Sequence, residues 1–241
     1  MARREPSAGA RNRAGSSTIR RNTVIKGVIF DLDGTLIDSM RIWYDIDRRF
    51  LRENGVTDPP EDISDRMKKM TIEDSSQYFI TEFGLDCTVS DVVTRIEEMV
   101  RVEYEENIPL KSGVVEMLDL LDRKGIPYGV ATATYKGLAE AALKRCGIYD
   151  RMQFVYTDRE YPNGKRFPDI FLGGAKRLGI APEEALVVED SLHCIETARE
   201  AGFPTAAIYD EANAAEWEEI KAFSDMSFKD MNGAAALFNN M

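Results

Sequence analysis

Short apolar runs alternate with helical stretches along most of the chain. Nearly continuous apolar segments are typical of buried strands in a parallel sheet, and they occur at residues 24–31, 128–132, 185–190 and 205–208, with a weaker one at 154–157. Helical periodicity fills residues 113–124, 136–146, 168–178 and 191–201. A glycine follows each helical stretch, where left-handed caps are expected: Gly125, Gly147, Gly179 and Gly202. The alternation predicts an α/β fold, with a doubly wound, Rossmann-like parallel sheet.

One long interval interrupts this alternation. Residues 39–108 contain no good strand and show helical patterns at 40–54, 61–70, 72–83 and 90–107. Thr71 and Asp74 form a capping-box pattern before the third of them. An insertion of this length exceeds an ordinary loop, so we expect an all-helical domain at 39–108 within a core made of 23–38 and 109–241. After residue 212 we expect a helix, a short strand near 226–228 and a closing helix.

Charge is distributed unevenly between the first residues and the rest. The net charge is -11, yet residues 1–22 hold six arginines and one acid, which leaves 25 basic and 41 acidic groups in residues 23–241. A body this acidic repels nucleic acid and anionic membranes, so neither is expected as a partner. Residues 1–22 lack the apolar segment of a secretory signal. We expect a disordered extension there, with an organelle transit peptide as the alternative.

The few cysteines and the single histidine limit the kinds of catalytic and metal site that the chain can form. Three widely spaced cysteines make a disulfide framework unexpected and favour a reducing compartment, hence a cytoplasmic protein, or an organellar one if the tail is a transit peptide. The single histidine, His193, nearly excludes a Ser-His-Asp triad and any multi-histidine metal site. No apolar run is long enough to cross a bilayer, and a monomer is expected. In an enzyme, carboxylates would therefore carry most of the proton and metal chemistry.

Polar side chains cluster at the predicted strand ends. The first strand ends in Asp31 and Asp33, the second in Thr132, and the fourth in the Glu189-Asp190 pair. Lys165 precedes a helix that starts near Pro168. Each has an ordinary explanation as a turn residue, strand former, solvated charge or helix cap. Parallel strands, however, place their carboxyl ends at one crevice, and four such coincidences favour a site there.

These residues resemble the motifs of the haloacid dehalogenase superfamily of phosphotransferases. The DLDGT run at 31–35 is similar to its first motif, Thr132 to its second, Lys165 in the run 165–169 to its third, and Glu189-Asp190 to its fourth. The helical insertion is similar to the C1 cap of subfamily IA, and the adjacent Glu-Asp pair resembles the β-phosphoglucomutase-like sugar-phosphate branch. Cys194 is a departure, because the commoner fourth motif has a second acid there.

The resemblance implies a Mg²⁺-dependent phosphatase, a phosphoric monoester hydrolase that acts on a small phosphorylated metabolite through a phosphoaspartate. It implies that Asp31 is nucleophile and metal ligand, and that Asp33 is general acid–base and a ligand through its carbonyl. Asp190 would be a further ligand, and Glu189 would support the ion directly or through water. The resemblance assigns Thr132 and Lys165 to the phosphoryl oxygens, with Lys165 also restraining Asp31.

Two alternatives stay open, a phosphomutase of the β-phosphoglucomutase type and a non-catalytic phosphate-binding regulatory protein. The resemblance implies that a mutase has a histidine and an arginine in the cap, where this chain has Trp43 and Ile72. Lys68 or Lys69 could replace that cation, but nothing in the spacing requires it. We therefore favour the phosphatase. We expect Phe50 to pack inside the cap and His193 to be a surface or packing residue. Trp43 and Tyr44 are candidates to face the substrate.

Overall fold

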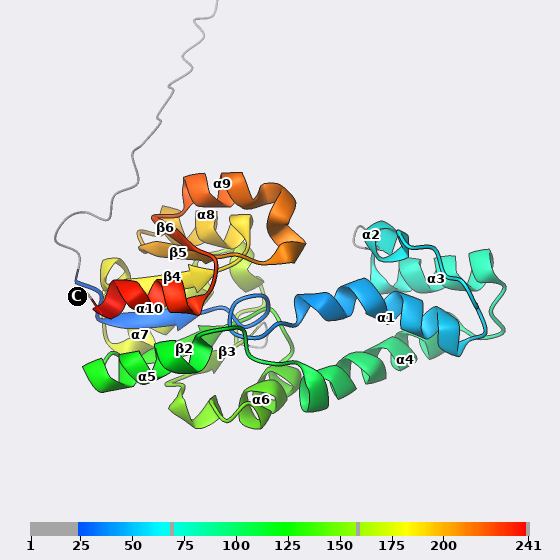
Figure 1. Cartoon of the computed structure of the whole chain (residues 1–241), viewed down its shortest axis with the longest axis horizontal. Coiled ribbons are helices and arrows are strands. Elements are labelled where there is room, and N and C mark those ends of the chain that lie inside the picture. The colour runs from blue at the N-terminus through cyan, green and yellow to red at the C-terminus, as the bar shows by residue number, and fades with distance from the viewer. Residues whose placement is uncertain (1–23, 68–69, 158–159, 240–241) are drawn as a thin grey trace, which may run out of the picture.

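The computed structural model describes residues 24–67, 70–157 and 160–239, without the side chains of residues 43, 44, 65, 237 and 239. The predictions for residues 1–22 and for the side chains of Trp43 and Tyr44 lie outside the described residues. The described chain forms a larger part around a sheet and a smaller helical part beside it (Figure 1). Within the described ranges, no helix has both the length and the hydrophobicity that a membrane crossing requires.

The described residues form one six-stranded parallel sheet with the order β3-β2-β1-β4-β5-β6. The strands are β1 (Gly27–Phe30), β2 (Tyr128–Ala131), β3 (Val155–Tyr156), β4 (Ala185–Glu189), β5 (Thr205–Ile208) and β6 (Met226–Phe228). From β1, the strands β2 and β3 follow on one side of the sheet, and β4, β5 and β6 follow on the other side. The predicted doubly wound sheet is thus confirmed, and the crevice of such a sheet lies at this reversal.

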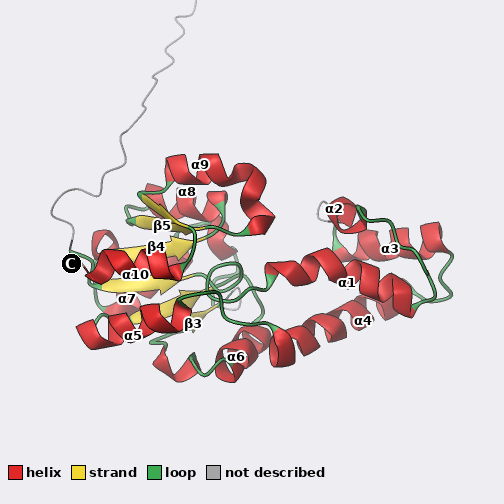
Figure 2. Ribbon diagram, in the orientation of Figure 1, coloured by secondary structure: helices red, strands yellow, loops and turns green. Residues whose placement is uncertain are grey.

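Helices cover both faces of the sheet because strand side chains alternate between them. Val28 and Phe30 pack into the larger core cluster, together with side chains of α5 (Val114–Lys124), α6 (Lys136–Arg145) and α10 (Met231–Asn239). Ile29 points the other way and joins residues of α7 (Asp169–Leu178) and α8 (Leu192–Glu200), with α9 (Trp217–Phe223) beside α8. Figure 2 shows this sheet between helices. The four glycines predicted to follow helices all have positive φ.

The smaller part consists of helices between β1 and β2. They are α1 (Met40–Glu53), α2 (Ile63–Met67), α3 (Ile72–Phe83), α4 (Val89–Val102) and the π-helical turn η1 (Glu103–Asn107). Phe50 is buried and stacks on Phe79 with ring centroids 5.8 Å apart, which confirms its packing role. The division at residues 38–39 and 108–109 stays a prediction.

Three details of the helical part differ from the sequence prediction. The helix expected at 61–70 begins at Ile63, with Met67 as its last described residue, and the helix expected to reach residue 107 changes to π geometry at Glu103. Thr71 accepts a hydrogen bond from the Asp74 amide (3.1 Å), which is half of the expected capping box. A reciprocal box occurs instead at Thr88, whose amide donates to Asp91 and whose hydroxyl accepts from the Asp91 amide. Periodicity alone does not distinguish these local geometries.

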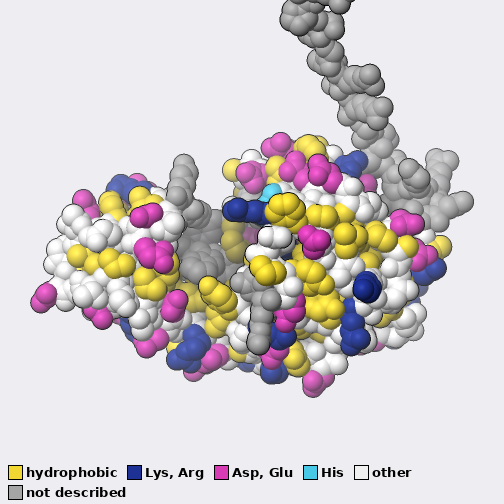
Figure 3. Space-filling model, turned by 180° about the vertical axis from the view of Figure 1, so that it is seen from behind, with side chains coloured by type: hydrophobic (Ala, Val, Ile, Leu, Met, Phe, Trp, Pro, Cys, Tyr) yellow, Lys and Arg dark blue, Asp and Glu magenta, His cyan; other side chains and the backbone are white. Residues whose placement is uncertain are grey.

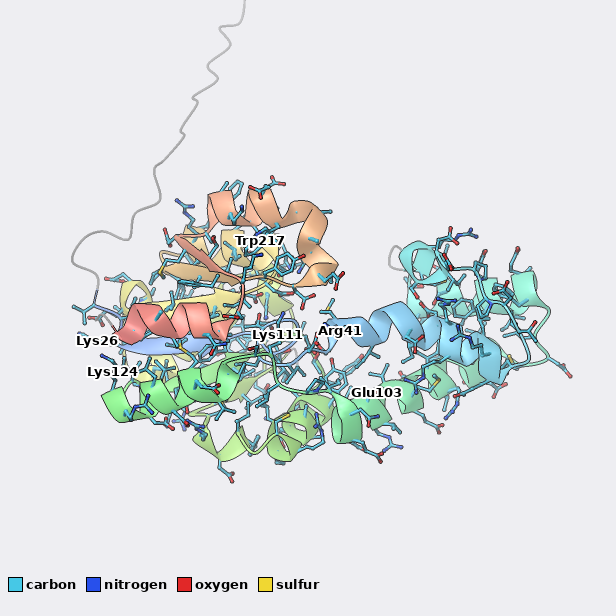
Figure 4. All side chains as sticks on the ribbon, in the orientation of Figure 1. Lys26, Arg41, Glu103, Lys111, Lys124 and Trp217 are labelled. Carbon is cyan, nitrogen blue, oxygen red and sulfur yellow. The ribbon has the colours of Figure 1, made fainter. Side chains whose placement is uncertain are left out.

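The two chain crossings between the parts are bonded to each other. Ile37 pairs with Leu110 in an isolated bridge, and the Lys111 amide donates to the Leu36 carbonyl (2.9 Å). The Lys111 ammonium donates to the Gly34 carbonyl (2.7 Å) and to the Asp210 carboxylate (2.7 Å). Figure 4 shows Lys111 at this junction, close to Arg41. These bonds fix the loop after β1 relative to the second crossing.

Candidate active site

The paired ends of β1 and β4 bring three carboxylates together. Phe30 lies opposite Val188 in the register of these strands, and the Asp31 amide donates to the Val188 carbonyl (2.9 Å). Asp31 therefore follows β1 at the level where Glu189 ends β4 and Asp190 follows it. One carboxylate oxygen from each of these three residues lies within 4.8 Å of the others, and all three side chains are buried.

Lys165 is the counter-charge in this cluster. It lies in the short turn η3 (Gly164–Arg166), and its buried ammonium donates to the carboxylates of Asp31 and Glu189, the latter at 2.6 Å. Burial opposes its charge, but the negative charges of Asp31 and Glu189 outweigh burial and raise the pKa of Lys165 well above its ordinary value. Lys165 is therefore a fixed cation at neutral pH.

One ammonium does not balance three carboxylates. If all were ionised, Asp31, Glu189, Asp190 and Lys165 would together carry a net charge of about -2 in a buried site. Burial and the charge of Glu189 raise the pKa of Asp31 to about 8, and burial and the charge of Asp31 raise that of Asp190. A divalent cation would neutralise this excess, and carboxylate oxygens are ligands that Mg²⁺ takes. The residues present thus fit a magnesium ion.

Gly34 and Asn213 shape the surroundings of Asp190. Gly34 has φ +75°, and a Cβ placed on it would lie 2.3 Å from the Asp190 Oδ2 atom, so the backbone requires glycine for two reasons. Asn213 donates from its amide nitrogen to the same oxygen (2.9 Å) and to the Asp190 carbonyl (3.2 Å). Asn213 is not among the residues predicted from sequence, although its place in η5 (Glu211–Glu216) after β5 is a signal for a crevice residue.

Asp33 faces a different set of partners. Its carboxylate accepts hydrogen bonds from the hydroxyls of Tyr104 (2.5 Å), Thr134 (2.6 Å) and Thr132 (3.4 Å). Burial and the negative charge of Asp33 raise the pKa of Tyr104, so its phenol remains a donor. Tyr104 lies in η1, far from Asp33 in sequence, and no sequence signal pointed to it. In this structure, Thr132 directs its hydroxyl toward Asp33.

All six predicted site residues line one cavity of about 700 Å³: Asp31, Asp33, Thr132, Lys165, Glu189 and Asp190. The back view in Figure 3 shows an indentation between the larger and the smaller part. His193 and Cys194 also contribute to the lining, where His193 is exposed, as expected, and Cys194 is buried. Burial and the charge of Glu189 raise the pKa of the Cys194 thiol, which keeps it protonated. Cys87, Cys146 and Cys194 all belong to the described part and are free thiols.

A comparison with protein families agrees with this site of buried carboxylates and a lysine. One family matches both the residues around the sheet and the helical insertion. The profile of the haloacid dehalogenase-like hydrolases matches residues 28–208. The chain belongs to this family. It is 31% identical over 199 residues to hexitol phosphatase A of Escherichia coli (strain K12), covering 81% of this chain and 88% of that protein. N-acetylmuramic acid 6-phosphate phosphatase of Pseudomonas aeruginosa is 29% identical over 202 residues, covering 80% and 88%.

Solved structures of this family share the fold of the chain. A Thermotoga maritima protein, provisionally named a beta-phosphoglucomutase, superposes with a TM-score of 0.80 at 23% identity, covering 90% of this chain and 100% of that one. A hydrolase of the haloacid dehalogenase family from Deinococcus radiodurans, solved with bound phosphate and sodium, gives 0.73 at 21% identity, covering 90% and 97%. The comparisons confirm the family resemblance and the expected enzyme class, a phosphoric monoester hydrolase.

Proposed function

We propose that the protein is a Mg²⁺-dependent phosphatase that hydrolyses the monophosphate of a small metabolite, a sugar phosphate or a related compound, through an aspartyl-phosphate. The observation that carries the proposal is the buried cluster of Asp31, Glu189 and Asp190 around Lys165 at the carboxyl ends of β1 and β4. A phosphate monoester is an anion that these carboxylates alone would repel. The site therefore requires the positive charge that Lys165 and a divalent cation provide.

In the first step, a carboxylate oxygen of Asp31 attacks phosphorus, and the bond between phosphorus and the ester oxygen breaks. The departing alcohol takes a proton from the carboxyl of Asp33. Lys165 and the hydroxyl of Thr132 stabilise the charge on the phosphoryl oxygens. The products of this step are the free alcohol and the aspartyl-phosphate on Asp31.

In the second step, a water molecule attacks the phosphorus of the aspartyl-phosphate and gives its proton to Asp33. The acyl–phosphate bond breaks, inorganic phosphate leaves, and the carboxylate of Asp31 is restored. Asp31, Asp190 and the Asp33 carbonyl would hold Mg²⁺, with Glu189 supporting the ion directly or through water. When bound, the ion supplies positive charge that screens the nucleophile from the phosphate and withdraws electrons from phosphorus.

The names of the relatives support the proposed substrate class, and one residue of the helical part supports a phosphatase over a mutase. Hexitol phosphatase A and N-acetylmuramic acid 6-phosphate phosphatase are named for sugar-type monophosphates. A mutase must also hold a second phosphate, for which a cation in the cap is needed. Ile72, at the position expected for the mutase arginine, lines an adjoining cavity with an apolar side chain. Water is therefore the proposed acceptor of the phosphoryl group.

A hydrolysis screen tests this function. The purified protein is given hexitol phosphates, hexose 6-phosphates, glycerol phosphate, phosphoglycolate and nucleoside monophosphates, and released phosphate is measured with Mg²⁺ and after chelation. We expect Mg²⁺-dependent release from one carbohydrate-type monophosphate or a few of them, and none from Asp31→Asn. Release that survives chelation and the Asp31→Asn change would sink the mechanism.

A second arm of the screen separates phosphatase from mutase. The protein receives β-glucose 1-phosphate with a trace of the 1,6-bisphosphate, and both glucose 6-phosphate and free phosphate are followed. We expect no rapid isomer formation. Fast conversion to glucose 6-phosphate with little phosphate release would establish the mutase instead.

A further inference from the structure

A second cavity, of about 530 Å³, adjoins the cavity that holds the catalytic candidates. Met40 and Asn213 line both cavities, so the two cavities meet between the first residue of α1 and η5. The remaining lining is mostly from the helical part and is largely apolar: Met67, Met70, Ile72 and Ile96. Three polar side chains interrupt it, those of Asp47, Ser64 and Ser75.

Asp47 is the charged group of this second cavity. It lies on α1 with 9% of its surface exposed, and the Ser64 hydroxyl donates a hydrogen bond to it. Among the described residues, no basic side chain forms a salt bridge with Asp47. Burial raises its pKa to about 6, against the lowering effect of Ser64, so at pH 7 and above most molecules carry the carboxylate. A buried carboxylate without a cation is costly unless it receives hydrogen bonds.

The residues that line this cavity indicate which chemical group would donate hydrogen bonds to Asp47. An ionised carboxylate can only accept, so its partner must be a donor. A quaternary ammonium would call for aromatic faces, and the described lining of this cavity contains no aromatic side chain. The Ser64 hydroxyl on the carboxylate and the Ser75 hydroxyl elsewhere in the lining, with methionine and isoleucine around them, match a carbon chain bearing hydroxyl groups. A second phosphate would be repelled by Asp47.

We propose that Asp47 is a specificity-determining residue that accepts a hydrogen bond from a hydroxyl of the leaving group, which selects monophosphates of polyhydroxylated compounds. This proposal rests on the proposed phosphatase function and deepens it. The phosphate would occupy the catalytic cavity, and the polyol chain would extend past Met40 into the second one. Phosphate esters without hydroxyls on the leaving group gain nothing from Asp47.

The test compares Asp47→Asn and Asp47→Leu with the unaltered protein on two Mg²⁺-activated substrates, a hexitol 6-phosphate and p-nitrophenyl phosphate. A hydrogen bond to a charged group is worth enough for an expected drop of about 10- to 100-fold in kcat/KM on the hexitol phosphate. The p-nitrophenyl phosphate value should stay within about 2-fold, since that leaving group offers no hydroxyl. Asn, which retains one acceptor oxygen, should lose less than Leu.

Ser75 and Ser76 provide a matched pair of control variants. Both hydroxyls donate to the Ile72 carbonyl, at 3.0 and 2.6 Å, and both side chains are buried. Ser75 lines the second cavity, whereas Ser76 is not part of its lining. Ser75→Ala should reduce kcat/KM on the hexitol phosphate selectively, and Ser76→Ala should leave both substrates unchanged.

The outcomes separate this inference from the proposed function. Equal losses on both substrates in the Asp47 variants would assign Asp47 a structural role and overturn the inference. Phosphoethanolamine hydrolysed faster than any polyol phosphate would show that the carboxylate binds a cation, which also overturns it. Failure of the unaltered protein to hydrolyse even p-nitrophenyl phosphate would instead refute the proposed phosphatase and this inference with it.

Discussion

Adding Mg²⁺ to the metal-free protein should release protons, and the number can be worked out from the site. The pKa of Asp31 is raised to about 8 by burial and by Glu189, so at pH 7 roughly 90% of the molecules hold a proton on it. A metal ligand must be ionised. Binding at pH 7 should therefore displace about 0.9 proton from Asp31. Asp190, whose pKa is also raised, adds to this number, and the count is a property of Asp31, Glu189 and Asp190 together.

The sign of the pH dependence follows from the same competition. Below pH 8, protons compete with the cation for Asp31, so the apparent affinity for Mg²⁺ should rise with pH and level off above that value. At pH 9, Asp31 is mostly ionised, and its contribution to proton release should fall to about 0.1.

Isothermal titration calorimetry measures this release directly. Mg²⁺ is titrated at pH 7 and pH 9 in pairs of buffers with different ionisation enthalpies, and the slope of observed against buffer enthalpy gives the number of protons. The control is Asp31→Asn, which lacks the titrating carboxyl and should lose about one proton of the pH 7 release. An observed enthalpy at pH 7 that is the same in both buffers would refute the electrostatic account of the cluster.

Three substitutions test individual residues of the site. Asp33→Asn should retain Mg²⁺ binding, because the carbonyl remains, and lose about 10²- to 10⁴-fold in kcat; a near-normal kcat would remove Asp33 from its role. Lys165→Met leaves buried carboxylates without their cation, so the free energy of unfolding, measured with urea at pH 7 without metal, should fall by about 3–5 kcal/mol. An unchanged free energy of unfolding would show that this pairing is unimportant. Gly34→Ala, which would place a Cβ against Asp190, should abolish Mg²⁺ binding in calorimetry, and normal affinity would contradict that geometry.

The four inner strands of the sheet, β1, β2, β4 and β5, could be predicted from sequence because they are buried on both faces. Each of these strands is a nearly continuous apolar run, and the residue after each run was placed at the crevice by the general rule for parallel strands. That rule alone predicts that Asp31, Thr132 and Asp190 lie at one site, and all three line the same cavity. The strand ends shifted by a few residues, as with β1, which begins at Gly27 rather than at residue 24.

Residues that reach the site across the two parts could not be predicted in this way. Tyr104 contacts Asp33 only because η1 packs beside the crevice, and the change from α to π geometry there has no periodic signature. Asp47 follows the polar and apolar pattern of an amphipathic helix, in which an acid is ordinarily a solvated residue. Its burial depends on how α2 and α3 close over α1, which one-dimensional patterns do not contain.

The central claim, that Asp31 becomes phosphorylated during turnover, is tested most directly by trapping the acyl phosphate. The protein is mixed with its best Mg²⁺-activated substrate, quenched within one turnover and reduced with borohydride, which converts a phosphorylated aspartate into homoserine. Peptide mass spectrometry then locates the change. We expect homoserine at position 31 in the presence of substrate and Mg²⁺, and unmodified aspartate when either is omitted. Modification of another acidic residue, or rapid turnover with Asp31 never modified, would contradict the account.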